Sequence, residues 1–287
     1  MSTPFGWLSR AMRVGFGRRY PFVLCYHGVG TLEHGRDPAG LFLSRGLFER
    51  HLDVIEQQRY EVVSVSELWR TMAAGSPAHR LASISFDDAL VKTAREAIPR
   101  MLERGMACSM FVPTGLMGRH HPDLEGELIL DPGELVELAG EGVEIGAHSV
   151  DHLWLPGLPY EQILDQMRRS KATLEDLLGK PVTSMAYPYG GHDDATMRAA
   201  AEAGFEVACG CSGPSSWSPL SLPRSPIFPS VTTLRLRMKM AGLYGPVHKL
   251  VADSGPIGRW RSGHPPADAS RAEHLEPRVQ PRQRTTV

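Results

Sequence analysis

The segment LASISFDD, residues 81–88, is a short, largely apolar run that ends on two adjacent carboxylates. A similar run, VEIGA at residues 143–147, leads into HSVDH at residues 148–152, where two imidazoles stand four positions apart. Short continuous apolar runs are typical of strands that are buried on both faces of a parallel sheet. Ligands and catalytic groups gather at the ends of such strands in open α/β and barrel folds. The two segments therefore predict an α/β fold with polar chemistry at one edge of its sheet.

Strand-like runs alternate with helical periodicity along most of the chain. Strands are predicted at residues 22–26, 61–65, 82–86, 108–112, 143–147, 184–187 and 206–210. Helices are predicted at residues 47–58, 91–104, 160–178, 193–203 and 232–244, and Pro99 is expected to kink or restart the second of them. About seven strands interleaved with helices predict a parallel sheet, either open or closed into a barrel.

Composition limits the class of protein. A length of 287 residues permits one large domain or two smaller ones, and 42% apolar with 22% charged residues is ordinary for a globular protein. The net charge of −1 argues against nucleic acid or an anionic membrane as the main partner. No stretch approaches the roughly 20 apolar residues of an integral membrane segment, and no secretory signal is recognised. Four cysteines without a disulfide or zinc spacing favour a reducing compartment, so a cytoplasmic location is expected.

Four parts are expected along the chain. Residues 1–20 form an N-terminal segment in which aromatic residues are scattered among arginines, and residues 21–230 carry the alternating pattern of one catalytic domain. Residues 231–261 are expected to form a helical extension. Residues 262–287 are rich in proline and arginine with almost no large apolar residues, so we expect a disordered tail.

The side chains at the two strand ends suit a catalytic metal. A His/His/Asp set with a spare carboxylate offers three protein ligands, an open position for water and a base to deprotonate it. The alternative is structural, because adjacent acids often form a solvated turn and two histidines at i and i+4 can lie on any helix surface. Their position directly after apolar strands favours the metal site. His120, His121 and His192 flank loops and could line the mouth of such a site, although loop histidines are usually exposed to solvent.

Three motifs make the chain similar to the polysaccharide deacetylase (NodB-homology) family, carbohydrate esterase family 4. The family's T-F-D-D-G is matched by SFDDA at residues 85–89, its H-[ST]-x-x-H by residues 148–152, and its R-x-P-Y by AYPY at residues 186–189. Similarity extends over about residues 21–229. The segment YHGV, residues 26–29, resembles the N-terminal Y-H-x-V strand that one branch of the family has. The resemblance implies a hydrolase built on a distorted (β/α) barrel of about seven parallel strands in a single domain.

The resemblance also assigns roles to residues. Asp88, His148 and His152 would hold a divalent metal, usually zinc in this family. Asp87 would be the general base that takes a proton from the attacking water. The backbone N–H of Tyr189 would be the donor that stabilises the oxyanion. A well-placed donor of this kind lowers the activation barrier by roughly 3–4 kcal/mol.

The general acid is expected from the first strand rather than the last. Much of the family uses a histidine on a late L-x-H strand, and this chain has no convincing strand of that kind. The first strand of a closed barrel neighbours the last, and here it ends on His27. Since an ordinary histidine pKa of about 6.5 suits proton donation, we assign His27 as the acid. A packing role, or one supporting the residues around the metal, is the alternative.

Two departures from the family pattern bear on the substrate. Ala186 stands where the motif has an arginine that orients the base, and Arg224 is a candidate to supply that guanidinium from another loop. An exposed loop arginine without such a role is the alternative. Ala89 replaces the usual glycine after the aspartate pair, so a Cβ is expected to narrow the cleft or adjust the backbone there.

The function expected from these residues is removal of N-acetyl groups from amino sugars of a polysaccharide or glycan precursor, which makes an acetylated amino-sugar glycan the partner. The same metal site could act on another acyl or C–N bond, such as an O-acetyl, a formyl group or a cyclic amide. A non-catalytic sugar-binding relative is a further alternative. Retention of a spare base at Asp87 counts against it, because a binding module has no use for that base.

Overall fold

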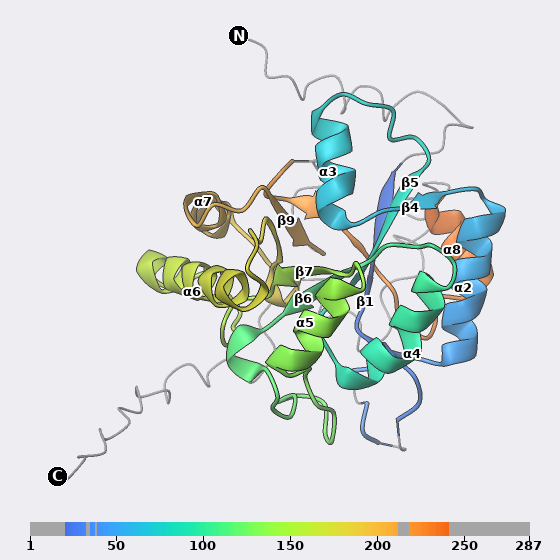
Figure 1. The fold of residues 1–287 in the computed structure, drawn as a ribbon, viewed down its shortest axis with the longest axis horizontal. Coiled ribbons are helices and arrows are strands. Elements are labelled where there is room, and N and C mark those ends of the chain that lie inside the picture. The colour runs from blue at the N-terminus through green and yellow to red at the C-terminus, as the bar shows by residue number, and fades with distance from the viewer. Residues whose placement is uncertain (1–20, 33–34, 38, 212–217, 241–287) are drawn as a thin grey trace.

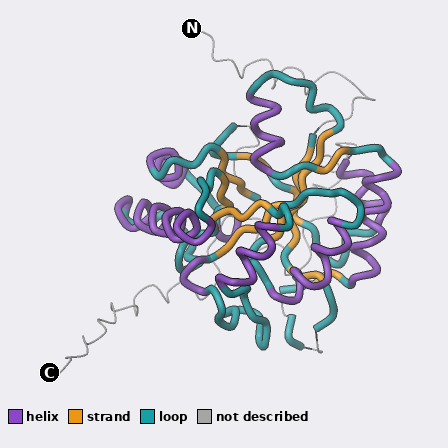
Figure 2. Tube along the Cα trace, in the orientation of Figure 1, coloured by secondary structure: helices purple, strands orange, loops and turns teal. Residues whose placement is uncertain are grey.

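The computed structural model describes residues 21–32, 35–37, 39–211 and 218–240. A parallel sheet lies at the centre and helices surround it, as Figures 1 and 2 show. The sheet strands are β1 (Phe22–Tyr26), β4 (Glu61–Val62), β5 (Leu81–Phe86), β6 (Ser109–Val112), β7 (Glu144–Ala147), β8 (Ser184–Ala186), β9 (Val207–Gly210), β10 (Leu222–Pro223) and β11 (Ser225–Pro226). A separate two-stranded pair consists of β2 (Gly28–Val29) and β3 (Phe42–Leu43).

The strand order β10-β9-β8-β7-β6-β5-β1-β11 bends the sheet into a nearly closed barrel. β10 pairs with β9 and β11 pairs with β1, and a single residue, Arg224, separates β10 from β11. The two ends of the strand order therefore meet in one stretch of chain. This architecture confirms the predicted distorted (β/α) barrel of parallel strands.

Seven α-helices lie around this sheet in the described part of the chain. They are α2 (Arg45–Gln57), α3 (Val65–Ala73), α4 (Val91–Leu102), α5 (Pro132–Gly140), α6 (Tyr160–Leu178), α7 (Asp194–Glu202) and α8 (Thr233–Met240), with short 3-10 turns η1 (Thr114–Leu116) and η2 (Pro188–Gly190). The longest, α6, ends at Gly179, whose φ of +63° is a conformation that glycine adopts without steric cost. Its buried side chains pack against the sheet, so the helix covers β7 and η1.

The structure differs from the sequence predictions at several elements. The strand predicted at residues 61–65 stops at Val62, because Ser64 caps α3 by accepting a hydrogen bond from the Glu67 N–H. α5 was not predicted, although Asp131 and Glu134 form the reciprocal capping box that marks a helix start. Helix α4 runs on through Pro99 to Leu102 and does not restart there.

Two of the four predicted parts lie outside the described residues: the N-terminal segment 1–20 and the tail 262–287. Of the predicted extension 231–261, the described part contains α8. None of the described helices is long and apolar enough to cross a membrane.

Candidate active site

The carboxylate pair lies at the carboxyl end of β5, beside the carboxyl end of β1. Tyr26 pairs with Phe86, and the N–H of Asp87 continues this ladder by donating to the Tyr26 carbonyl at 3.0 Å. The backbone then turns sharply, since Asp88 and Ala89 have φ values of +67° and +50°. Left-handed backbone costs a non-glycine residue about 1–2 kcal/mol, so this turn is held by the fold around it.

The two histidines come from the end of β7. His148 follows Ala147, and its Nδ1–H donates to the Ala186 carbonyl at 2.7 Å, which leaves the Nε2 lone pair directed at the carboxylates. Burial lowers the pKa of His148 to about 4, so the imidazole is neutral near pH 7, the form in which histidine binds metals. His148 Nε2 and His152 Nε2 lie 3.7 and 3.2 Å from the same oxygen, Asp88 Oδ1.

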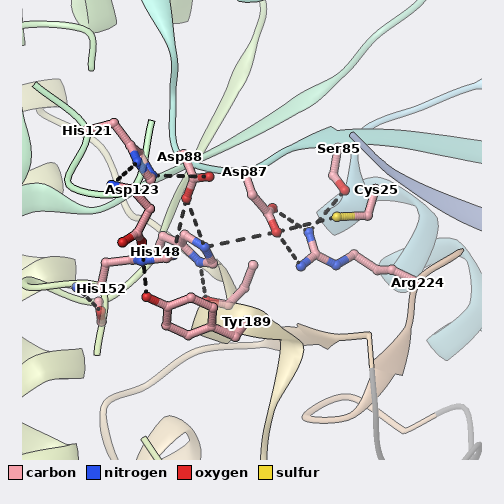
Figure 3. A network of polar contacts seen from close by, with 12 residues as sticks. Cys25, Ser85, Asp87, Asp88, His121, Asp123, His148, His152, Tyr189 and Arg224 are labelled. Carbon is pink, nitrogen blue, oxygen red and sulfur yellow. Dashed lines mark hydrogen bonds and ion pairs between the residues drawn. The ribbon is translucent and has the colours of Figure 1, made fainter. Parts of the chain in front are cut away.

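Asp88, His148 and His152 together offer three ligand atoms, all within 4.8 Å of one another and all buried (Figure 3). Asp88 Oδ1 accepts no hydrogen bond from the described residues, although it is fully buried. A buried carboxylate oxygen without a donor is costly, and the lone pair of His148 Nε2 faces it and adds repulsion. A divalent cation held by these residues would remove both problems. The donor set therefore fits a metal of the kind that histidine and carboxylate bind, and zinc is among them.

Arg224 lies where the barrel closes, and its guanidinium binds the Asp87 carboxylate. Nη1 donates to Asp87 Oδ1 at 2.6 Å and Nη2 donates to Oδ2 at 2.8 Å, a bidentate pair that fixes the carboxylate plane. Burial alone would raise the pKa of Asp87, but Arg224, followed by His148, outweighs it and holds the pKa below its usual value. With only 5% of its surface accessible, Arg224 is not an exposed loop arginine.

His27 and Cys25 border Asp87 from β1. A ring nitrogen of His27, the Cys25 sulfur and an Asp87 oxygen lie within 4.8 Å of one another, and the Cys25 thiol donates to Asp87 Oδ2 at 3.4 Å. Cys25 is buried, so its contact with Asp87 lies in the interior of the barrel. The end of the first strand thus brings His27 to the same place as the carboxylates.

Tyr189 closes the opposite side of the site. It lies in η2 with a φ of +57°, and its ring centroid is 4.6 Å from that of His152. Its hydroxyl donates to Asp123 at 3.5 Å, and burial raises its pKa. All seven residues predicted for the site, from β1 to the segment before β11, therefore lie around one small volume.

His121 is a residue of the site that the sequence did not assign. The expectation that loop histidines are exposed is wrong here, because His121 is buried and its Nε2 lies 3.5 Å from Asp88 Oδ2. Its Nδ1 accepts the Asp123 N–H at 3.1 Å, which places the ring proton on Nε2, facing Asp88. Burial lowers the pKa of His121, but Asp88 more than offsets this and the net pKa is raised. No motif spacing distinguishes His121 from its neighbour His120.

Known proteins resemble this chain in sequence and in fold. Residues 74–208 match the family model described as polysaccharide deacetylase. YxkH of Bacillus subtilis (strain 168), which its name places among the polysaccharide deacetylases, is 25% identical over 186 residues, covering 64% of this chain. The match covers 62% of that relative, so the chain spans less than two thirds of its length.

Two solved structures share the fold. The deacetylase PplD of Streptococcus pyogenes, solved in complex with acetate, has a TM-score of 0.68 at 23% identity and covers 77% of this chain and 98% of its own. IcaB from Ammonifex degensii has a TM-score of 0.67 at 23% identity, with coverages of 78% and 97%. The family model spans the sheet from before β5 to β9, including both carboxylates and both histidines. On these grounds the chain resembles the polysaccharide deacetylase family over residues 74–208 and shares the fold of solved deacetylase structures.

Proposed function

We propose that this protein is a metal-dependent hydrolase that removes N-acetyl groups from amino sugars of a polysaccharide or glycan precursor. The observation that carries the proposal is a division of labour between adjacent carboxylates. Asp88 shares a buried group with His148 and His152, whereas Asp87 is turned toward Arg224. A metal site with a separately oriented base is the equipment of a hydrolase, and a sugar-binding module does not need it.

The metal would be held by Asp88, His148 and His152, with zinc as the expected ion. When bound, such an ion polarises the acyl carbonyl and lowers the pKa of water toward neutrality. The protein's contribution is to direct both histidines at one oxygen of Asp88. For His148, burial keeps the imidazole neutral, and the Ala186 carbonyl fixes its proton on Nδ1, so that Nε2 faces Asp88.

Asp87 would take the proton from the attacking water. Its Oδ2 lies 4.0 Å from His148 Nε2, so one oxygen of the base borders the ligand group. Arg224 keeps the carboxylate ionised, because protonation would weaken two charge-assisted hydrogen bonds. A general base of this kind contributes typically about 10²–10⁴-fold to the rate.

The backbone N–H of Tyr189 would donate to the oxyanion that forms as water adds to the carbonyl. Its left-handed conformation lies in η2, directly beside the His152 ring. A backbone donor fixed in advance stabilises developing charge without reorganisation at the moment of reaction.

The basic test combines metal analysis with acetate release. Purified wild type should contain about one divalent metal per chain and lose activity to a chelator. We expect Asp87→Asn to keep the metal and lower kcat by roughly 10³-fold, since the base is removed but no ligand is. His148→Ala should lose both metal and turnover. Metal-free, chelator-insensitive wild-type protein would contradict the proposal.

The acyl group is tested with a substrate panel. N-acetylated amino-sugar oligomers, O-acetylated sugars, N-formyl sugars and cyclic amides are offered to the same preparation, and the released acid or opened ring is quantified. The proposal expects N-acetyl substrates to give the highest kcat/KM. A higher value for any other class would replace the substrate while leaving the metal chemistry in place.

His27 would protonate the leaving amine, because its ring borders Asp87 on the side of β1. We expect His27→Gln to lower kcat by about 10²-fold or more on an N-acetyl substrate. The loss should shrink for an acetate ester of a nitrophenol, whose leaving group needs no proton. His79→Gln, at an exposed histidine, is the matched control. Equal losses on both substrates would instead indicate that His27 only supports the fold around Asp87.

A further inference from the structure

The segment that carries both histidines, residues 148–152, is here called the ligand loop. One side of it is held by backbone N–H groups of η1. The N–H of Thr114 donates to the Ser149 carbonyl at 3.1 Å, and that of Gly115 donates to the Val150 carbonyl at 2.8 Å. The approach is close, since a Cβ on Gly115 would lie 2.9 Å from the Val150 carbonyl oxygen. Two carbonyl groups of the loop are thus bound by main chain.

Two N–H groups in the middle of the ligand loop are held by one side chain. Gln166 Oε1, on helix α6, accepts hydrogen bonds from the N–H of Val150 at 3.0 Å and of Asp151 at 2.9 Å. The amide of the same side chain donates to Asp151 Oδ2 at 2.6 Å. Gln166 is 4% exposed and faces the barrel from a helix whose other buried residues are mostly apolar.

The conformation of the ligand loop requires such a restraint. Ser149 and His152 have φ values of +62° and +54°, which non-glycine residues adopt only where contacts impose it. Within the loop, the His152 N–H bonds to Ser149 Oγ at 3.1 Å. That bond closes the turn but does not anchor it to the barrel. Gln166 ties the middle of the turn to α6, between the two histidines.

We propose that Gln166 is a positioning residue of the metal site: it sets the distance between His148 and His152 by clamping the backbone between them. This inference rests on the proposed function, because it assumes that the two histidines hold a metal. Removing the clamp leaves two N–H groups without an acceptor and releases a strained turn, so the histidine pair no longer arrives in one arrangement. Residues that orient metal ligands typically contribute about 10–100-fold in metal affinity.

The test measures Co²⁺ bound to chelator-stripped protein, by competition with a chromophoric chelator and by the visible absorption of the ion. Gln166→Leu fills the same space without hydrogen bonds, and we expect about 10–100-fold weaker Co²⁺ binding with a changed spectrum. Ser170→Ala, one turn further along α6, is the control: its buried hydroxyl bonds within its own helix, to the Met167 carbonyl. It should leave both the affinity and the spectrum unchanged.

A paired substitution separates positioning from general stability. Gln166→Glu keeps an acceptor for the two N–H groups but sets a carboxylate against Asp151, so Co²⁺ binding should weaken. The double variant Gln166→Glu/Asp151→Asn reverses the polarity of that contact and should recover affinity to within about threefold of wild type, because the two sites are directly coupled.

The outcomes distinguish two failures. Wild-type protein that binds no Co²⁺ would overturn the proposed metal site itself. Wild-type binding together with an unchanged affinity and spectrum in Gln166→Leu would overturn the clamp alone. A double variant that folds like wild type yet binds Co²⁺ as weakly as Gln166→Glu would also contradict it.

Discussion

Left-handed residues are concentrated around one site. Of the six non-glycine residues with positive φ in the described ranges, five are Asp88, Ala89, Ser149, His152 and Tyr189. Each such conformation costs about 1–2 kcal/mol and persists only where the surrounding structure imposes it. Ala89 shows this directly, because it carries a Cβ at a φ of +50° where the family usually has glycine. Strain of this kind is characteristic of preorganised sites.

Replacement of Arg224 tests how much the geometry of the base matters. Lysine keeps the charge but cannot form two parallel hydrogen bonds to Asp87. We expect Arg224→Lys to retain the metal and lower kcat by about 10²-fold, the usual cost of misplacing a catalytic group by an ångström. Steady-state kinetics with metal analysis measures both quantities. Arg168→Lys, at an exposed pair with Glu202, is the control, and an unchanged kcat in Arg224→Lys would contradict the prediction.

At the level of residues, the sequence predicts the site residues that stand in short motifs and misses those that are brought together from distant parts of the chain. The aspartate pair and the histidines stand in short motifs, so their grouping could be anticipated. The missing motif arginine at Ala186 was visible, but its replacement by Arg224 rests on a contact across 137 positions. His121 had no such signal, because its burial arises from a loop that folds back over Asp88.

Elements were predicted well where periodicity is long. The 19-residue α6 has the predicted bounds, and β1 also agrees at both ends. Two-residue strands such as β4, β10 and β11 leave no pattern in a sequence, since they are defined by neighbours in the sheet. α3 was misread because Val62 and Val65 belong to a strand and to a helix on either side of one capping serine.

A single carboxylate at the start of β7 joins several elements. Glu144 accepts hydrogen bonds from the hydroxyls of Ser66 on α3, Ser109 on β6 and Ser184 on β8, the last at 2.8 Å. It also accepts the Ser66 N–H at 3.3 Å. The carboxylate lies at the opposite end of β7 from His148, away from the proposed chemistry.

We therefore expect Glu144→Ala to lower the free energy of unfolding by about 2–4 kcal/mol, because three hydroxyls lose their acceptor at once. Urea unfolding followed by circular dichroism measures this. Glu141→Ala, at the exposed end of α5, should change it by less than about 0.5 kcal/mol. Similar values for the two variants would show that the serine hydroxyls find other partners.

Across the whole molecule, His51 links α2 to the segment that follows the last strand. Its Nε2–H donates to the Val231 carbonyl at 2.8 Å, and its Nδ1 accepts the Tyr26 hydroxyl at 3.1 Å. Both nitrogens are satisfied only in the neutral ring. Burial lowers the pKa of His51 below its ordinary value of 6.5, so the folded protein takes up this proton less readily than the unfolded chain.

Stability linked to His51 is therefore complete above about pH 6.5 and is lost as the pH falls toward the folded-state pKa, at up to about 1.4 kcal/mol per pH unit. His51→Gln can make both hydrogen bonds and does not titrate. We expect the metal-free variant to lose less stability than metal-free wild type between pH 7 and pH 5, as measured by urea unfolding. Parallel losses would mean that His51 keeps its ordinary pKa.

The closure of the barrel through Arg224 has a consequence for how the protein is made. A ribosome adds Asp87, Asp88, His148 and His152 well before it reaches Arg224. The growing chain thus carries every proposed ligand while its base has no guanidinium to aim it. On the proposed roles, hydrolysis therefore requires β10 and β11 to be synthesised and docked, because Arg224 lies between them.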